Sequence, residues 1–181
     1  MFIAKDKKIG LLPLGYVDPK ALKYLQQELG PIFDCKIEVK EPKDIPSQTY
    51  DKQRRQYQAS EILEHLKKLK GRERYEAVLA VTEVDLFVPD LNFVFGVADH
   101  WTKLAIISLA RLKMGFLGIM NVNEKMYLER TLKEAVHELG HVYGLGHCSD
   151  PKCVMFFSNS LMDTDRKGYQ FCSKCKKKLK R

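Results

Sequence analysis

The spacing of apolar residues alternates along the N-terminal half of the chain between short runs and residues three or four apart. Apolar runs bounded by polar or turn residues are typical of strands, and the wider spacing is typical of amphipathic helices. The runs predict strands at residues 8–14, 32–39, 77–81, 91–97 and 104–109. Helical spacing predicts one helix that begins at Asp18-Pro19 and stops at Gly30, and a second from Ala59 to Gly71.

Strands that alternate with helices predict an α/β fold with right-handed βαβ units and a largely parallel sheet. Asn123 predicts the start of a further, long helix, whose sheet-facing side carries Leu128, Leu132, Ala135 and Leu139. A length of 181 residues, 45% apolar content and the lack of an internal repeat predict a single domain over residues 1–181. We expect a sheet-and-helix part at residues 1–121, followed by the long helix and a C-terminal segment at residues 122–181.

The net charge of +8 is concentrated at one end of the chain. Six positive residues lie within the last eight positions, so residues 1–173 are nearly balanced. A basic tail of this kind is usually a solvated terminus, although it can hold phosphates. Nucleic-acid binding is therefore not the expected function. It is kept as an alternative, in which the chain is a zinc-knuckle protein that binds nucleic acid through its tail.

Residues 137–147 carry the pattern HExxHxxGxxH, which predicts a catalytic metal site. Residues four apart share one helix face, so His137 and His141 can bind one zinc ion. Gly144 can adopt the left-handed conformation that ends a helix and turns His147 toward the metal. Three imidazoles leave one position for water, and Glu138 beside it is the expected general base.

Four cysteines follow the histidines in the pattern C-x4-C-x18-C-x2-C, at Cys148, Cys153, Cys172 and Cys175. The final C-x2-C is typical of a four-thiolate structural zinc site. Two disulfides are the alternative. Cys35 is left over and is expected to be a buried strand residue.

The compartment decides between these two alternatives for the cysteines. The chain opens Met-Phe-Ile-Ala-Lys-Asp-Lys-Lys without an apolar signal segment, and no stretch approaches membrane-spanning length. A cytoplasmic protein is therefore expected. Reducing conditions favour metal thiolates, so we expect two zinc ions per chain, one catalytic and one structural.

The methionine of Cys153-Val-Met155 lies eight residues after His147, and together with the extended histidine pattern it resembles a metzincin zinc protease. The added cysteines, and the upstream segment at residues 81–96, are similar to archaemetzincins. In that clan the methionine, here Met155, forms a turn beneath the metal. Phe157 departs from the clan members that place a tyrosine two residues after this methionine, because phenylalanine can neither ligate zinc nor stabilise an oxyanion.

The resemblance implies a metzincin-like single domain with a mixed, mostly parallel sheet and an antiparallel edge strand. It also implies a long zinc-binding active-site helix and a C-terminal helical segment tied by the four-cysteine zinc site. The resemblance also implies a peptide cleft along an edge strand, here residues 92–97. It implies peptidase activity as well, and an aminopeptidase is one form that this activity can take.

Several other residues are expected to have ordinary structural roles. His65 and His100 are expected on the surface, with a place near the cleft as the alternative for His100. Glu134 is expected to be an exposed helix glutamate, and the alternative is that it orients a metal ligand or lines the cleft. Phe93 and Phe95 alternate in a way that more often indicates core than a substrate pocket.

The leading hypothesis is a monomeric zinc-dependent peptidase that acts on peptides or proteins and does not contact membranes. Its alternatives are a catalytically weak zinc-containing peptide-binding or regulatory protein, which the missing tyrosine allows, and a zinc-knuckle nucleic-acid binder.

Overall fold

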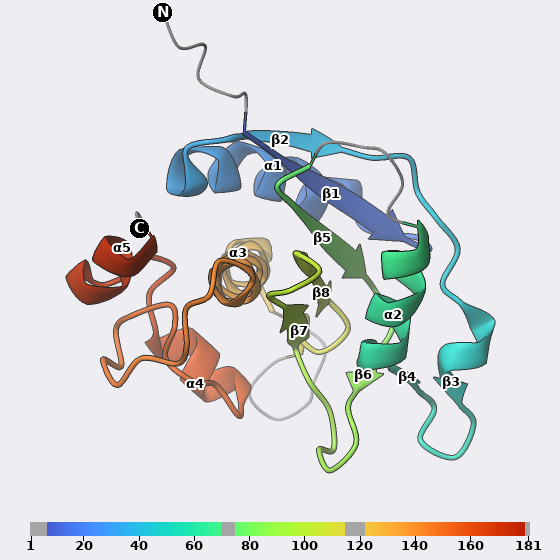
Figure 1. The fold of residues 1–181 in the computed structure, drawn as a ribbon. Helices are drawn as coiled ribbons and strands as arrows, with labels where there is room; N and C mark the ends of the chain where they lie inside the picture. Colours follow the sequence, from blue (N-terminus) through green and yellow to red (C-terminus); the bar gives the residue numbers. More distant parts are fainter. Residues whose placement is uncertain (1–6, 70–74, 115–121, 180–181) are drawn as a thin grey trace, which may run out of the picture.

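The computed structural model describes residues 7–69, 75–114 and 122–179. A five-stranded sheet runs in the order β2 (Lys36–Val39), β1 (Lys8–Leu14), β5 (Ala77–Thr82), β8 (Leu104–Ser108) and β7 (Gly96–Asp99) (Figure 1). β7 pairs with β8 in antiparallel fashion, and the other pairs are parallel. The predicted α/β fold with a mostly parallel sheet and an antiparallel edge strand is therefore confirmed.

Helices cover both faces of this sheet (Figure 1). Alternate strand residues point to opposite faces, so Leu11 packs with α1 (Pro19–Phe33) and α3 (Glu124–Val142), whereas Leu12 packs with α2 (Ala59–Leu69). Because both faces are covered, β1, β5 and β8 are apolar almost throughout, which is why their positions could be predicted.

The boundary between α1 and β2 differs from the prediction. The strand predicted at residues 32–39 begins only at Lys36, because α1 continues through Pro31 to Phe33 and ends in a left-handed cap at Asp34. Phe33 stacks on Tyr143 with a ring separation of 5.5 Å, so its packing favours the longer helix. α2 ends at Leu69, and the predicted stop at Gly71 lies outside the described residues.

The strand predicted at residues 91–97 is also wrong in its position. β7 occupies Gly96–Asp99, and the preceding residues make a single bridge, from Val94 to Leu86. Residues 91 and 92 form a bend directly after Asp90, which has a left-handed φ of +72°, so no extended strand begins there. Some short elements elsewhere in the chain were not predicted. They are η1 (Ser47–Thr49) and a small sheet formed by β3 (Tyr50–Asp51), β4 (Gln56–Gln58) and β6 (Leu86–Phe87).

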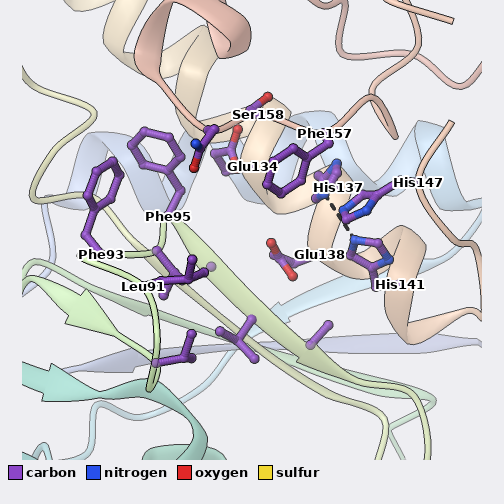
Figure 2. A pocket seen from close by; sticks show the side chains of 16 residues that line it. Leu91, Phe93, Phe95, Glu134, His137, Glu138, His141, His147, Phe157 and Ser158 are labelled. Carbon is purple, nitrogen blue, oxygen red and sulfur yellow. Dashed lines mark hydrogen bonds between the residues drawn. The ribbon is translucent and has the colours of Figure 1, made fainter. Parts of the chain in front are cut away.

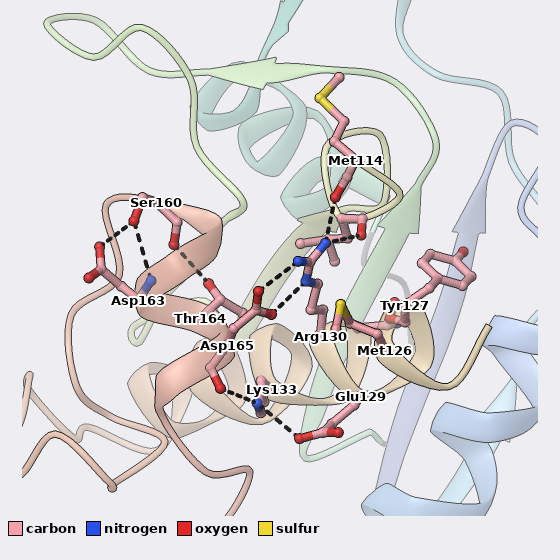
Figure 3. A network of polar contacts seen from close by, with 12 residues as sticks. Met114, Met126, Tyr127, Glu129, Arg130, Lys133, Ser160, Asp163, Thr164 and Asp165 are labelled. Atoms are coloured by element: carbon pink, nitrogen blue, oxygen red, sulfur yellow. Dashed lines mark hydrogen bonds and ion pairs between the residues drawn. The ribbon is translucent and has the colours of Figure 1, made fainter. Parts of the chain in front are cut away.

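The long helix α3 begins as predicted, with Asn123 Oδ1 accepting from the backbone N–H of Met126 at 2.8 Å. Arg130 fixes the helix to its neighbours (Figure 3). Its guanidinium binds both oxygens of Asp165 on α4 (Leu161–Arg166), at 2.6 and 2.7 Å, and the backbone carbonyl oxygens of Leu112 and Met114. α3 is therefore held on both sides, and α5 (Ser173–Leu179) completes the chain.

The division into residues 1–121 and 122–181 stays a proposal. One apolar cluster contains residues of β1, β5, β8 and α3 together, which supports a single domain across the division. Among the helices of the described residues, none is both long and apolar enough to cross a membrane.

Candidate active site

Three histidines meet around the C-terminal end of α3 (Figure 2). His137 and His141 lie one turn apart on one face of the helix, and their Nε2 atoms are 3.1 Å apart. The helix ends at Val142, and Gly144 then takes φ = +86°, a conformation that a side chain would strain. This turn brings back His147, so that one nitrogen of each ring lies within 4.8 Å of the others.

The outer nitrogens of the two helical histidines bind backbone carbonyls. His137 Nδ1 lies 2.8 Å from the oxygen of Val154, and His141 Nδ1 lies 2.7 Å from the oxygen of Leu145. A carbonyl oxygen can only accept, so each Nδ1 carries the proton and each Nε2 keeps a free lone pair. Both rings are thereby oriented for metal binding.

Burial keeps the three imidazoles neutral. Burial, together with the positive charge of Lys167, lowers the pKa of His137 to about 3. Burial likewise lowers the pKa of His141 and of His147. Neutral imidazole is the form that binds a metal ion.

The four cysteines form a second group, with their Sγ atoms within 4.8 Å of one another. Two thiolates on one tetrahedral zinc ion are about 3.8 Å apart, and two imidazole nitrogens about 3.3 Å apart. The Sγ atoms of Cys148 and Cys172 are 3.8 Å apart, and the Nε2 atoms of His137 and His141 are 3.1 Å apart. The backbone N–H of Cys175 lowers the pKa of Cys172 to about 7, so a thiolate forms readily there. Both donor sets therefore suit zinc.

Met155 lies between the two groups of ligands. It is fully buried, and its backbone oxygen accepts from the N–H of Cys148 at 2.9 Å. A Cβ on Gly140 would collide with the Met155 sulfur, so this glycine lets the methionine pack directly on α3 between His137 and His141. The turn at residues 153–155 thus supports the histidines and is tied to the cysteines.

Glu138 lies next to His137 on α3, with its carboxylate at the side of the three rings (Figure 2). Burial, together with the neighbouring carboxylate of Glu134, raises the pKa of Glu138 to about 8. On the other side lies β7, where a Cβ on Gly96 would be 2.6 Å from Glu138 Cγ. The absence of a side chain at Gly96 therefore leaves the room that Glu138 occupies.

A cleft of about 300 Å³ opens beside these residues. Its walls are β7, α3 and the segment before β7, and Phe157 lies at its edge, with its ring 5.0 Å from that of His147. Phe93 and Phe95 line the cleft, although their alternation in the sequence indicated core. Phe95 satisfies both descriptions, because it is 6% exposed and packs in the main apolar cluster.

The preferred interpretation of Glu134 as an exposed glutamate is wrong, whereas the alternative that it lines the cleft agrees with the structure. Glu134 is only 3% exposed, and its Oε1 lies 3.1 Å from the Nζ of Lys167, which is fully buried. The Thr164 hydroxyl donates to the same oxygen at 3.2 Å. No spacing pattern links Lys167 to α3, so this buried pair could not be found from the sequence.

The remaining histidines lie outside the group formed by His137, His141 and His147. His65 is on α2 with Nδ1 3.4 Å from the amide of Gln48. His100 is exposed, as predicted, but its Nδ1 also lies 2.9 Å from the oxygen of Val142, the last residue of α3. The ring of His100 therefore helps to terminate the helix before Gly144.

Comparison with known proteins agrees with this geometry. The model of peptidase family M54 matches residues 21–181. The archaemetzincin of Methanocaldococcus jannaschii is 43% identical over 172 residues, covering 95% of this chain and 92% of that protein. The archaemetzincin of Pyrococcus furiosus is 42% identical over 174 residues, covering 93% and 90%. The chain belongs to peptidase family M54.

Solved structures of archaemetzincins share the fold. The crystal structure of the Archaeoglobus fulgidus archaemetzincin complexed with malonate has a TM-score of 0.81 at 37% identity, covering 94% of this chain and 99% of that chain. The Methanopyrus kandleri archaemetzincin has a TM-score of 0.82 at 36% identity, covering 97% and 96%. The resemblance inferred from the sequence is confirmed, and membership of family M54 makes this chain a zinc metallopeptidase with peptide or protein substrates.

Proposed function

We propose that this M54 peptidase hydrolyses peptide bonds in the cleft beside His137, His141 and His147, with Glu138 as the general base. The observation that carries the proposal is the position of the Glu138 carboxylate, buried at the side of three neutral imidazoles that converge within 4.8 Å. Met155 and Gly144 belong to the same proposal as residues that hold the histidines in place.

The chain's own residues divide the chemistry between them. Zinc bound to the three imidazoles would polarise the scissile carbonyl and lower the pKa of a water molecule. Glu138 accepts the proton of that water and returns it to the leaving amine. Burial raises the pKa of Glu138 above that of an exposed glutamate, which makes its carboxylate a stronger base.

The edge strand β7 is the proposed binding site for substrate main chain. It is the last strand of the sheet and lines the cleft, so its outer N–H and C=O groups can pair with an extended peptide of any sequence. The proposed peptide-binding strand, β7, lies a few residues later in the chain than the predicted edge strand at residues 92–97.

A finer part of the proposal is cleavage beside a free amino terminus. Glu134 supports this part of the proposal, because its carboxylate lines the cleft. Both of its side-chain contacts among the described residues use Oε1, so Oε2 is the oxygen proposed to accept from the amino group of a substrate. The test is a panel of matched peptides with free and acetylated amino termini. Loss of cleavage on acetylation supports the aminopeptidase type, and equal cleavage of both contradicts it.

No cleavage of any peptide would favour the alternative function, a peptide-binding protein of low activity. Phe157 in place of a tyrosine is the observation that supports this alternative.

Two zinc ions per chain are the expected metal content. Elemental analysis should find two equivalents in the purified protein. Chelator should remove the ion held by the partly exposed histidine group faster than the ion held by the cysteine group, because thiolates bind zinc more tightly and two of them are buried. Peptidase activity should disappear with the first equivalent and return when zinc is added. A single equivalent, or full activity without metal, would contradict the two-site proposal.

The proposed cysteine site implies a reducing environment, since oxidation of Cys148, Cys153, Cys172 and Cys175 would compete with metal binding. The monomeric state stays a prediction, and its measurement is the molar mass in solution.

A further inference from the structure

One wall of the cleft has little regular structure of its own. Residues 88–95, here called the rim segment, connect β6 to β7, and Val88, Leu91, Phe93 and Phe95 line the cleft. The segment contains the left-handed residue Asp90 and a single bridge to β6. A segment of this kind needs contacts from outside itself to keep one shape.

Arg54 supplies such contacts from the turn between β3 and β4. Its Nη2 donates to the backbone oxygen of Leu91 at 2.6 Å and to that of Asn92 at 3.2 Å. Its guanidinium also lies over the ring of Phe87, 4.3 Å from the centroid. One exposed arginine thus holds two consecutive carbonyls of the rim segment.

Gln56 connects this arginine to a second support. Its Oε1 accepts from Arg54 Nε at 3.1 Å, and its Nε2 donates to the oxygen of Asn92 at 3.0 Å and to Asp85 Oδ2 at 2.9 Å. Gln56 is buried, so these bonds form away from competing solvent.

Asp85 in turn is held by Arg111, which follows β8. The guanidinium donates to both carboxylate oxygens, at 2.8 and 2.7 Å, and its carbon lies 4.1 Å from the centroid of the Phe93 ring. The rim segment is therefore held at its backbone by Arg54 and Gln56 and at a lining side chain by Arg111.

We infer that Arg54, Gln56, Asp85 and Arg111, here called the rim network, are positioning residues that keep the rim segment in the shape that receives the peptide. The inference rests on the proposed function of the cleft. The network acts on the wall of the cleft and not on the proton transfer at Glu138, so it should govern substrate binding more than the chemical step.

The test is the substitution Arg54→Ala, which removes an exposed side chain and leaves the core intact. We expect KM to rise about tenfold and kcat to change less than about twofold, because the lost hydrogen bonds come from a charged donor. Arg54→Lys keeps the charge and one donor group and should restore part of the loss. Lys52→Ala, in the same turn, is the matched control for the removal of one charge and should behave as the unmodified protein. An unchanged KM, or an equal fall in kcat, would overturn the inference.

Hydrogen exchange measures the same effect without any peptide. The backbone amides of residues 91–95 should exchange faster in Arg54→Ala than in Lys52→Ala, with exchange in α3 unchanged. If the unmodified protein cleaves no peptide, the proposed function fails, and exchange alone still decides whether Arg54 holds the rim segment. Equal exchange in the two variants would refute that role.

Discussion

Replacing Glu138 with glutamine is expected to lower kcat by a factor of about 10²–10⁴ while the protein keeps its zinc. Glutamine preserves the shape of the side chain between α3 and Gly96, so the fold and the cleft should not change. It cannot take a proton from water, and this is the step that the carboxylate performs in the proposed mechanism. The measurement is steady-state hydrolysis of a cleaved peptide, together with zinc content by elemental analysis.

The control for this substitution is Glu124→Gln, which removes a carboxylate at the exposed beginning of the same helix. It should leave kcat unchanged. A Glu138→Gln protein that retains its full zinc content and its full rate would exclude Glu138 as the base. Loss of zinc in that variant would instead show that the carboxylate acts by holding the metal site together.

Replacing Lys167 with methionine is expected to lower the free energy of unfolding by about 3–5 kcal/mol, because the carboxylate of Glu134 then stays buried without its cation. Lys167 is fully buried and Glu134, which borders the cleft, is only 3% exposed, so water can replace the missing partner only in part. Chemical denaturation of the metal-loaded protein measures the loss. Lys152→Met, at an exposed lysine of the same region, should change stability by less than about 0.5 kcal/mol.

The double variant Glu134→Gln with Lys167→Met separates loss of the pair from loss of packing. It should be more stable than Lys167→Met alone, because no buried charge remains unpaired. Equal stability of the single and double variants would show that the ion pair contributes nothing specific and that lysine packing explains the effect.

The central strands could be located from sequence for a simple physical reason. β1, β5 and β8 are covered on both faces, so an unbroken apolar run marks each of them. The errors lie where a tertiary contact decides. Packing of Phe33 extends α1 past Gly30, and strands of two or three residues, such as β3 and β6, are too short to show a period.

The two groups of candidate metal ligands could be recognised from the sequence because their geometry is local. A helix turn separates His137 from His141, a glycine turn delivers His147, and the cysteines follow directly. The supporting groups are distant in sequence and have no spacing pattern. Glutamate is usually an exposed residue, so the burial of Glu134 was not expected. Every residue of α3 from Thr131 to Gly140 is buried, so even its charged residues lie inside the protein.

The adjacency of His147 and Cys148 has a consequence for biosynthesis. The ribosome makes His147 well before Cys172 and Cys175, the thiols that complete the neighbouring group. If the proposed cysteine site helps to hold His147, this imidazole would gain that support only after both thiols have been made. A nascent polypeptide of this kind would acquire its hydrolytic activity late, when Cys172 and Cys175 have left the ribosome.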